Sequence, residues 1–294
     1  MCWIASSATA LVNRPERDMR ARAHPTRLVL LGHPVIQSLS PVFQNAALAH
    51  VGLALRYEAL DVTSADLAVT LQSLGADGAA GNITIPHKEA VAARARCTPL
   101  ATQVGAVNTF WFEHGVLCGD NTDVAGVSAA IRALCPGGIA HARCAVLGAG
   151  GSAAAVLVAL EQLGCRDIVV SARTPERARR LAGRVAVPIR IVDSAEDAVQ
   201  EASLVINATP VGLRDDAMPV PPSALAPHAA ALDLVYRHGE TAWVRACREA
   251  DHMAEDGLRL LLEQGASAFE CWFGQVAPRA VMWQALAAAG GRPT

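Results

Sequence analysis

The stretch CAVLGAGGSAAAVLVALEQLG, residues 144–164, decides the fold class of this chain. It opens with the apolar pattern of a strand, and Gly148, Gly150 and Ala153 then follow as G-x-G-x-x-A at the start of an alanine-rich helix. A strand, a glycine-rich turn and a helix in this order are typical of a dinucleotide-binding turn, in which the helix N-terminus faces a pyrophosphate. A glycine-rich turn that holds no ligand is the alternative for this motif taken alone.

The next predicted strand, residues 168–171, indicates which dinucleotide is bound. Arg173, Thr174 and Arg177 follow it, in place of the acidic residue that would bind a ribose 2′-hydroxyl. Guanidinium groups pair well with a phosphate, so the sequence favours NADP over NAD. We expect Thr174 to cap the following helix. A solvated helix face is the alternative interpretation of Arg177.

Apolar runs alternate with helical patterns along the chain from Arg27 onward. Strands are expected at residues 28–31, 55–60, 81–85, 144–147, 168–171, 189–192, 204–207 and 231–234. Helical patterns cover residues 40–50, 152–163 and 175–182. Such alternation predicts parallel α/β sheets. Asn207 and Thr209 lie at the carboxyl end of one of these strands, where such a sheet binds its ligands.

Composition limits the classes of partner. The 294 residues are 52% hydrophobic and carry a formal net charge of −2, without the basic excess that nucleic acid would require. Eight cysteines form no CxxC pair, so we expect neither a zinc site nor disulfides, and a reducing cytoplasm fits. The longest uncharged apolar run, residues 144–160, is interrupted by glycines, so no membrane span is expected.

Residues 1–26 are expected to be a disordered extension. Their short apolar stretch comes before the arginines, which is the reverse of a secretory signal. A true start at Met19 and an arginine-rich transit peptide remain open, although Glu16 and Asp18 weaken the second.

In GHPVIQSLSPVFQNAAL, residues 32–48, two hydroxyls precede a helix. Ser40 is predicted to be the N-cap, with Pro41 as the first helical residue. A cap alone would explain Ser40 but not Ser38, and two hydroxyls at a helix N-terminus make a small anion site suited to a carboxylate.

In GNITIPHKEA, residues 81–90, a strand is expected to end at Pro86 and a helix to begin there, with Lys88 in its first turn. The positive end of the helix dipole disfavours a cation, so this amine is suited to act as a general acid and base. An ordinary surface lysine is the alternative. His33 and His87 are interpreted as structural or solvent-facing.

The segment GDNTD, residues 119–123, supplies polar groups just before the predicted dinucleotide domain, and Asn108 lies between apolar residues shortly before it. Polar groups at a domain junction lie in a cleft. Asp123 near Lys88 would hold the amine and form a coupled pair that moves a hydroxyl proton. Turn and cap chemistry by Asp120 and Thr122 is the alternative.

Together these motifs resemble the shikimate dehydrogenase family over nearly the whole chain from Arg27. The resemblance rests on the ordered set Ser38-x-Ser40-Pro41, Asn82-x-Thr84-x-Pro86-x-Lys88, Gly105–Thr109, Gly119–Asp123, Gly148–Gly151, Arg173-Thr174 with Arg177, Asn207–Thr209, Asp233–Tyr236, and Asp256–Leu258 followed by Gln264. It implies an α/β protein of two domains. A substrate-binding domain with a mainly parallel sheet would cover residues 27–123 and 257–294, with C-terminal helices returning to it, and a Rossmann-type, doubly wound NADP-binding domain would cover residues 124–256.

The implied reaction is the NADPH-dependent, reversible reduction of 3-dehydroshikimate to shikimate, a step towards aromatic amino acids, without a metal, by a monomer or homodimer. Lys88 and Asp123 would be the catalytic pair. The implied substrate residues are Ser38, Ser40, Thr84, Asn108, Asp123, Tyr236 and Gln264. The implied cofactor residues are Gly148, Ala149, Gly150, Gly151, Ser152, Ala153, Arg173, Thr174, Arg177, Asn207, Thr209 and Gly257.

The chain departs from the family pattern at three positions. Ala172 stands where Asn is usual, and Arg259 and Glu263 stand where small residues are common. We expect Arg259 and Glu263 either to pair with each other at i, i+4 or to alter substrate choice. A quinate or dual quinate/shikimate dehydrogenase, often NAD-dependent, is the nearest alternative. A non-catalytic NADPH-sensing regulatory protein is a more remote one.

Overall fold

The computed structural model describes residues 24–292. The expectations for residues 1–23, including the alternative start at Met19, lie outside the described residues. The fold was expected to begin at Arg27, but it already involves the residues before it. The backbone N–H of Thr26 donates to the carbonyl of Gly78 at 3.3 Å, and the ring of His24 packs edge-on against Phe273.

The first of two six-stranded sheets is formed near the N-terminus and has the order β2-β1-β3-β5-β6-β4. Its strands are β1 (Leu28–Gly32), β2 (Tyr57–Asp61), β3 (Ala80–Ile83), β4 (Arg96–Cys97), β5 (Thr109–Glu113) and β6 (Val116–Asp120). The β1–β2, β1–β3 and β4–β6 pairs are parallel, and β5 forms antiparallel pairs with β3 and β6. Sequence patterns missed β4, which has only two residues, and the β5–β6 hairpin, which has no helix between its strands.

The second sheet is parallel throughout, with the order β12-β11-β10-β7-β8-β9. Its strands are β7 (Arg143–Leu147), β8 (Asp167–Ser171), β9 (Ile189–Val192), β10 (Leu204–Asn207), β11 (Ala230–Asp233) and β12 (Ala254–Glu255). The chain winds outward from β7 in one direction and from β10 in the other. This doubly wound order places a ligand crevice at the carboxyl ends of β7 and β10.

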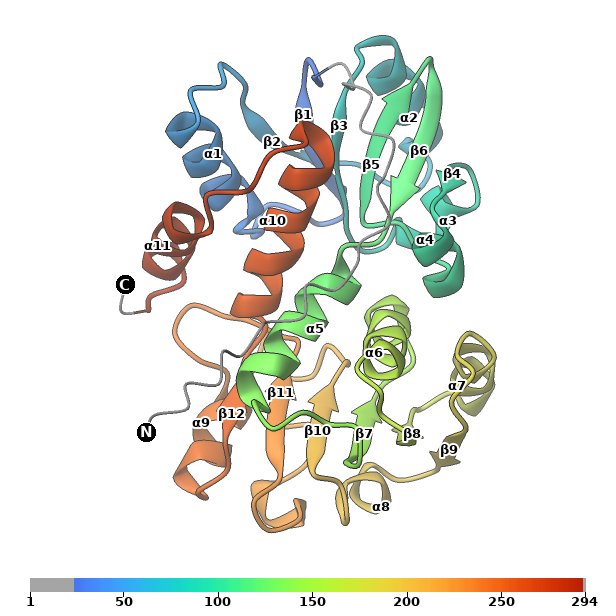
Figure 1. Ribbon diagram of the computed structural model, residues 1–294, viewed down its shortest axis with the longest axis vertical. Helices are drawn as coiled ribbons and strands as arrows, with labels where there is room; N and C mark the ends of the chain where they lie inside the picture. Colours follow the sequence, from blue (N-terminus) through green and yellow to red (C-terminus); the bar gives the residue numbers. More distant parts are fainter. Residues whose placement is uncertain (1–23, 293–294) are drawn as a thin grey trace, which may run out of the picture.

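Helices cover both faces of each sheet (Figure 1). They are α1 (Ser40–His50), α2 (Leu67–Ala76), α3 (Lys88–Ala92), α4 (Pro99–Val104), α5 (Asp123–Leu134), α6 (Gly151–Gln162), α7 (Pro175–Ala182), α8 (Ala195–Val199), α9 (Ala242–Glu249), α10 (Leu258–Phe273) and α11 (Arg279–Ala289), with a short 3₁₀ turn at Pro222–Ala224. One core joins β1, α1, α10 and α11 through Leu30, Phe43, Phe269 and Leu286. The C-terminal helices therefore return to the first sheet.

Helices α5 and α10 cross at very short range, and this crossing sets where their polar residues meet. A Cβ added at Gly126 of α5 would lie 2.7 Å from the carbonyl oxygen of Leu260 and 3.2 Å from the Cβ of Gln264, both on α10. The absence of a side chain at Gly126 therefore lets Gln264 approach the start of α5.

We predict that Gly126→Ala destabilises the fold. Overpacking costs about 1–3 kcal/mol, which exceeds the roughly 1 kcal/mol that alanine gains over glycine within a helix. Urea unfolding measures the change. Gly137→Ala is the control, because nothing lies within 4 Å of a Cβ at Gly137. Equal or greater stability of Gly126→Ala would contradict this account of the crossing.

Candidate active site

The site centres on an ion pair between the first residues of two helices. Lys88 begins α3 and Asp123 begins α5, and the Lys88 Nζ lies 2.6 Å from the Asp123 Oδ2. Their side chains are 17% and 10% exposed. Two groups that are 35 positions apart in sequence thus form an almost buried acid–base pair.

Lys88 is held differently from the way the sequence suggests. The helix begins at Lys88 and not at Pro86, and it has only five residues. A helix this short contributes little dipole, so the carboxylate of Asp123 is the main partner of the amine. The preceding His87 is buried, with its Nε2 2.6 Å from the carbonyl oxygen of Val62, which anchors the backbone beneath the amine. His87 is therefore structural.

Lys88 is also the one lysine in the chain, whose basic residues number 25. The sequence offers this signal directly, and motif analysis did not use it. Every other basic side chain of this count is a guanidinium, which does not release its proton under physiological conditions. The amine at this position is therefore the one basic side chain of the Lys/Arg type that can exchange a proton.

Asn108 fixes the other oxygen of the Asp123 carboxylate. Its Nδ2 lies 2.8 Å from the Asp123 Oδ1, 3.0 Å from the Thr122 Oγ1 and 3.2 Å from the Gln264 Oε1. Its own Oδ1 accepts the backbone N–H of Thr122 at 2.6 Å. Asp123 is thus oriented by Lys88 on one oxygen and by Asn108 on the other, while Gln264 arrives from α10.

Capping of α5 differs from the turn chemistry considered above. Thr122 occupies the N-cap position without a side-chain cap bond, and the Asn121 side chain accepts the N–H of Asp123 at 3.1 Å. The Asp120 carboxylate accepts the N–H of Asn121 at 2.8 Å and a hydrogen bond from Thr98. Asp123 is therefore not needed as a cap.

The predicted carboxylate site lies between the two sheets. Ser40 is the first residue of α1 and not its N-cap, which is Leu39. The Ser38 hydroxyl accepts the N–H of Ser40 at 3.2 Å and so supplies the local turn bond that Ser40 was expected to make. Tyr236, which follows β11, reaches this place: burial raises its pKa, and hydrogen bonds with the Ser38 hydroxyl and the Leu39 backbone oppose the rise.

Thr84 lies directly after β3, half-buried at the carboxyl edge of the first sheet. Its methyl group would lie 2.4 Å from a Cβ at Gly32, so Gly32 leaves it room. The loops after β1 and β3 therefore meet, which brings Thr84 near the segment that carries Ser38.

The glycine-rich turn is shaped for close backbone approach by a ligand. Gly148 has a φ of +113°, and a Cβ there would lie 2.8 Å from the carbonyl oxygen of Ala208. Nothing lies within 4 Å of a Cβ at Gly150 or Gly151, which begin α6. Ala153 is fully buried against the core. Ala149 and Ser152 are half-buried in the same turn and first helical turn.

Arg173 and Arg177 are exposed after β8, and neither forms an ion pair with a residue in the described range 24–292. Arg179 on the same helix pairs with Glu176 at 3.2 Å. Thr174 occupies the N-cap position of α7, but its side chain makes no cap bond, so the expected cap is wrong. Ala172, the first departure from the family pattern, packs against the hydrophobic core.

Asn207 acts on its own loop. It is fully buried, its Oδ1 accepts the Thr209 hydroxyl at 2.6 Å and the Thr209 N–H at 3.0 Å, and its Nδ2 donates to the Asp233 Oδ1 at 2.9 Å. Thr209 contacts the glycine-rich turn, since its methyl group lies 3.1 Å from a Cβ position at Gly148. The Asn207 side chain therefore shapes the loop that borders the turn.

Gly257 lies between β12 and α10, where backbone packs against backbone. Its N–H donates to the carbonyl of Val235 at 3.0 Å, and a Cβ there would lie 2.3 Å from the carbonyl oxygen of Leu234. Gly257 and Tyr236 are thus held by the same short segment after β11.

The expected pair of Arg259 and Glu263 does not form. Arg259 binds Glu255 at 2.6 Å, and Glu263 binds Arg279 at 2.9 Å. Glu255, at the end of β12, is the other i, i+4 neighbour of Arg259, and Arg279 is the first residue of α11. Neither charge is therefore left unpaired next to Gln264.

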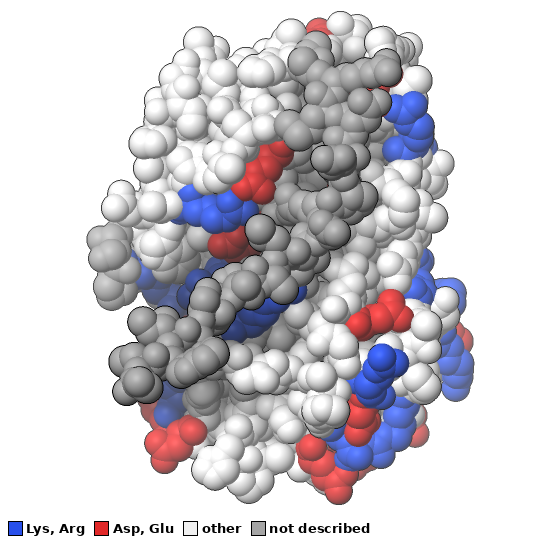
Figure 2. Space-filling view, viewed as in Figure 1, with Lys and Arg blue, Asp and Glu red and all other residues white. Residues whose placement is uncertain are grey.

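Within residues 24–292 there is no group of three or more His, Cys, Asp and Glu side chains arranged to hold a metal ion. None of the described helices is long and apolar enough to cross a membrane. On the face seen in Figure 2, basic and acidic side chains lie next to one another at the lower right of the molecule.

Asp233 holds two loops of the candidate site together through hydrogen bonds. The sequence analysis did not include it among the site residues. It is 1% exposed and its Oδ1 accepts from Asn207 and from the N–H of Val235 at 3.0 Å. Burial raises its pKa to about 6, although hydrogen bonds from Val235, Thr241 and Asn207 act in the opposite direction. One buried carboxylate thus ties the Asn207 loop to the segment that carries Tyr236.

We predict that Asp233 makes stability fall as pH rises. Its pKa is about 6 in the folded chain against 3.8 for a free side chain, so the folded state binds more protons between these values. The free energy of unfolding should therefore decrease by about 2 kcal/mol from this group between pH 4 and pH 7. Asp233→Asn should lack this component in urea unfolding. A stability difference between the two proteins that is constant with pH would contradict the assignment.

Three family models match the chain in order. The shikimate dehydrogenase substrate binding domain matches residues 30–110, the shikimate / quinate 5-dehydrogenase model matches residues 132–212, and the shikimate 5′-dehydrogenase C-terminal domain matches residues 257–287. The second and third matches flank the β11 and β12 region that carries Asp233 and Tyr236.

Relatives match over most of their length. A shikimate dehydrogenase (NADP(+)) of Moorella thermoacetica is 42% identical over 287 residues, which cover 93% of this chain and 96% of the relative. One of Mesorhizobium japonicum is 40% identical over 83% of this chain and 89% of its own. Shikimate 5-dehydrogenase from Thermus thermophilus, solved in complex with NADP(H) and shikimate, superposes with a TM-score of 0.82 at 38% identity, covering 90% of this chain and 99% of that one. This chain belongs to the shikimate dehydrogenase family.

Proposed function

We propose that this protein is an NADP-dependent shikimate dehydrogenase that reversibly reduces 3-dehydroshikimate to shikimate. The observation that carries the proposal is the Lys88–Asp123 pair, whose charged atoms lie 2.6 Å apart. Asn108 and Gln264 adjoin the pair. Relatives of 40% identity and more bear the same activity in their names.

In this proposal Lys88 and Asp123 divide the proton chemistry between them. Lys88 gives its proton to the C3 oxygen of the ring during reduction and takes it back during oxidation. Asp123 orients the amine and balances its charge, because its Oδ2 lies 2.6 Å from the Lys88 Nζ and its Oδ1 accepts from Asn108. When bound, NADPH supplies the hydride that reduces C3.

The ring carboxylate is assigned to the hydroxyls of Ser38, Ser40 and Tyr236. Ser38 and Ser40 come from the loop after β1 and the start of α1, and Tyr236 comes from the segment after β11. Hydrogen bonds join Tyr236 to Ser38 and to the Leu39 backbone. A carboxylate has two acceptor oxygens and would take over hydrogen bonds that these donors make with one another. Thr84, Asn108 and Gln264 are assigned to the ring hydroxyls.

The cofactor residues are assigned along the carboxyl edge of the second sheet. The open backbone of Gly150 and Gly151 at the start of α6 suits a pyrophosphate, and Gly257 would approach the nicotinamide through its backbone. The exposed guanidinium groups of Arg173 and Arg177 suit the 2′-phosphate, with Thr174 between them. The remaining assignments are Gly148, Ala149, Ser152, Ala153, Asn207 and Thr209.

We also propose the domain limits, the cellular location and the oligomeric state that the sequence implies. Residues 27–123 and 257–294 would form the substrate-binding domain, which the shared core of β1, α1, α10 and α11 supports. Residues 124–256 would form the NADP-binding domain around the second sheet. A cytoplasmic monomer or homodimer is proposed, in keeping with eight scattered cysteines that form no CxxC pair.

We predict turnover with shikimate and NADP⁺ that depends on the Lys88 amine. Initial rates at the nicotinamide absorbance band, with shikimate or quinate and NADP⁺ or NAD⁺, should be highest for shikimate with NADP⁺. Lys88→Arg keeps the positive charge beside Asp123 but cannot release a proton, so kcat should fall by about 10²–10⁴-fold with little change in KM.

The outcomes of this assay separate the competing functions. A preference for quinate or NAD⁺ would indicate that the protein is a quinate or dual quinate/shikimate dehydrogenase. NADPH binding without turnover on either acid would favour a sensor. If Lys88→Arg keeps the kcat of the wild type, Lys88 does not transfer the proton, and the assignment of the substrate is unaffected.

We predict that the double substitution Arg173→Ala/Arg177→Ala weakens discrimination for NADP⁺. Hydrogen bonds to a charged group contribute about 1.5–3 kcal/mol, so the ratio of kcat/KM for NADP⁺ over NAD⁺ should fall by about tenfold or more. Arg179→Ala is the matched control on the same helix, because Arg179 pairs with Glu176. An equal loss with both cofactors would refute the assignment to the 2′-phosphate.

A further inference from the structure

The C-terminal end of the chain crosses from the first sheet to the second. Helix α11 packs against α1 beside the first sheet (Figure 1). Just after it, the carbonyl of Gly290 accepts the N–H of Gly239 at 2.8 Å, in the loop that follows β11. A Cβ at Gly291 would lie 2.6 Å from the ring of His238, so this contact is close. Arg292 thereby arrives at the edge of the second sheet.

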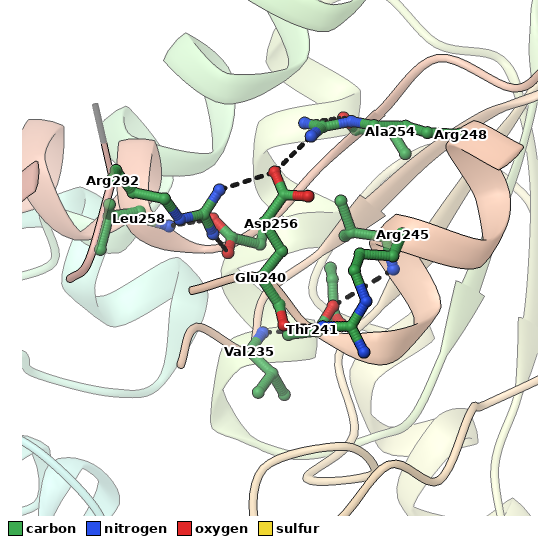
Figure 3. A network of polar contacts seen from close by, with 11 residues as sticks. Val235, Glu240, Thr241, Arg245, Arg248, Ala254, Asp256, Leu258 and Arg292 are labelled. Carbon is green, nitrogen blue, oxygen red and sulfur yellow. Dashed lines mark hydrogen bonds and ion pairs between the residues drawn. The ribbon is translucent and has the colours of Figure 1, made fainter. Parts of the chain in front are cut away.

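Arg292 lies between two carboxylates (Figure 3). Its Nη1 is 2.8 Å from the Glu240 Oε1, and its Nη2 binds the Asp256 Oδ2. The Arg292 side chain is 16% exposed and that of Asp256 is 3% exposed. Burial raises the pKa of Asp256, and the charge of Arg292 is the largest influence that lowers it.

Asp256 uses its second oxygen to fix the backbone next to it. The Oδ1 accepts the N–H of Leu258, the first residue of α10, at 3.1 Å. Gly257 lies between these two residues, with its own N–H bound to Val235. Asp256 therefore sets the path of Gly257 and the start of the helix that carries Gln264.

The other cations of this network do not replace Arg292. Arg248 binds the Glu240 carboxylate and the carbonyl of Ala254, and Arg245 donates to the Glu240 carbonyl at 3.2 Å. Within residues 24–292, Arg292 is the one basic side chain that forms an ion pair with Asp256. Loss of one partner of a buried pair leaves a charge that is neither solvated nor balanced.

We propose that Arg292 is a positioning residue for the reaction. By neutralising Asp256 it holds Gly257 and the first turn of α10 where the nicotinamide and the ring hydroxyls are assigned. This inference rests on the proposed function, and it assigns the C-terminal segment a part in the geometry of both ligands.

Steady-state kinetics of Arg292→Gln, Arg292→Lys and Arg245→Gln test the proposal. Arg292→Gln should lower kcat by about tenfold and raise KM for NADP⁺, within the roughly 100-fold that a misplacement of about 1 Å costs. Arg292→Lys should recover part of the loss because it restores a cation. Arg245→Gln, which loses a bond to Glu240 without touching Asp256, should behave as the wild type. The proposal would be overturned if Arg292→Gln lowers the melting temperature but leaves kcat and the KM for NADP⁺ unchanged at temperatures where the protein is folded.

A second comparison isolates the buried charge. Asp256→Asn keeps an acceptor for the Leu258 N–H and removes the negative charge, so Asp256→Asn/Arg292→Gln should be faster than Arg292→Gln alone. Equal kinetics of the double and single variants would overturn the role given to Asp256.

The failure of the proposed function would look different. If the wild type turns over neither shikimate nor quinate, the dissociation constant for NADPH, measured by its fluorescence, tests Arg292 on its own. Arg292→Gln should then bind NADPH several-fold more weakly than Arg245→Gln, and equal binding by the two variants would overturn the proposal.

Discussion

The carboxylate of Asp123 is the point on which the rest of the site depends. It stands at the start of α5, where that helix leaves the first sheet, and it binds Lys88 through one oxygen and Asn108 through the other. The crossing of α5 and α10 then brings Gln264 to the same amide. A displacement of α5 would therefore disturb the contacts of Asp123 with Lys88 and Asn108 together, which makes helix packing part of the geometry of the proposed site.

Two further buried carboxylates lie at the carboxyl edge of the second sheet. Asp233 and Asp256 lie at the carboxyl ends of neighbouring strands. Each accepts a hydrogen bond from the backbone N–H two residues later in the chain, that of Val235 and that of Leu258. Buried carboxylates are costly unless they are paired or hydrogen-bonded. Of the two, only Asp256 has a cation among residues 24–292, so they respond differently: Asp233 can take up a proton near pH 6, while Asp256 depends on Arg292.

The sequence predicts helices and strands that have their own local pattern. It does not predict contacts between elements that only the packed structure brings together. The helices at residues 40–50 and 175–182 and the strands at 189–192 and 204–207 agree with the structure residue by residue, because each has its own period and end signals. The β5–β6 hairpin was missed although His114 and Gly115 both have positive φ values, as a tight two-residue turn requires. The partners of Glu263 and Arg292 depend on which elements meet in space, and spacing along a helix predicts neither of them.

The distribution of arginine and lysine fits the proton-transfer role proposed for Lys88. Wherever this chain needs a fixed positive charge it uses arginine: at Asp256, at Glu240 and Glu263, and on the exposed edge after β8. A guanidinium suits these places because it is planar, makes several hydrogen bonds and keeps its proton. The lone lysine stands beside a carboxylate whose oxygens are both engaged by side chains from other elements. In the proposed function this amine does what arginine cannot, which is to give up a proton and take it back.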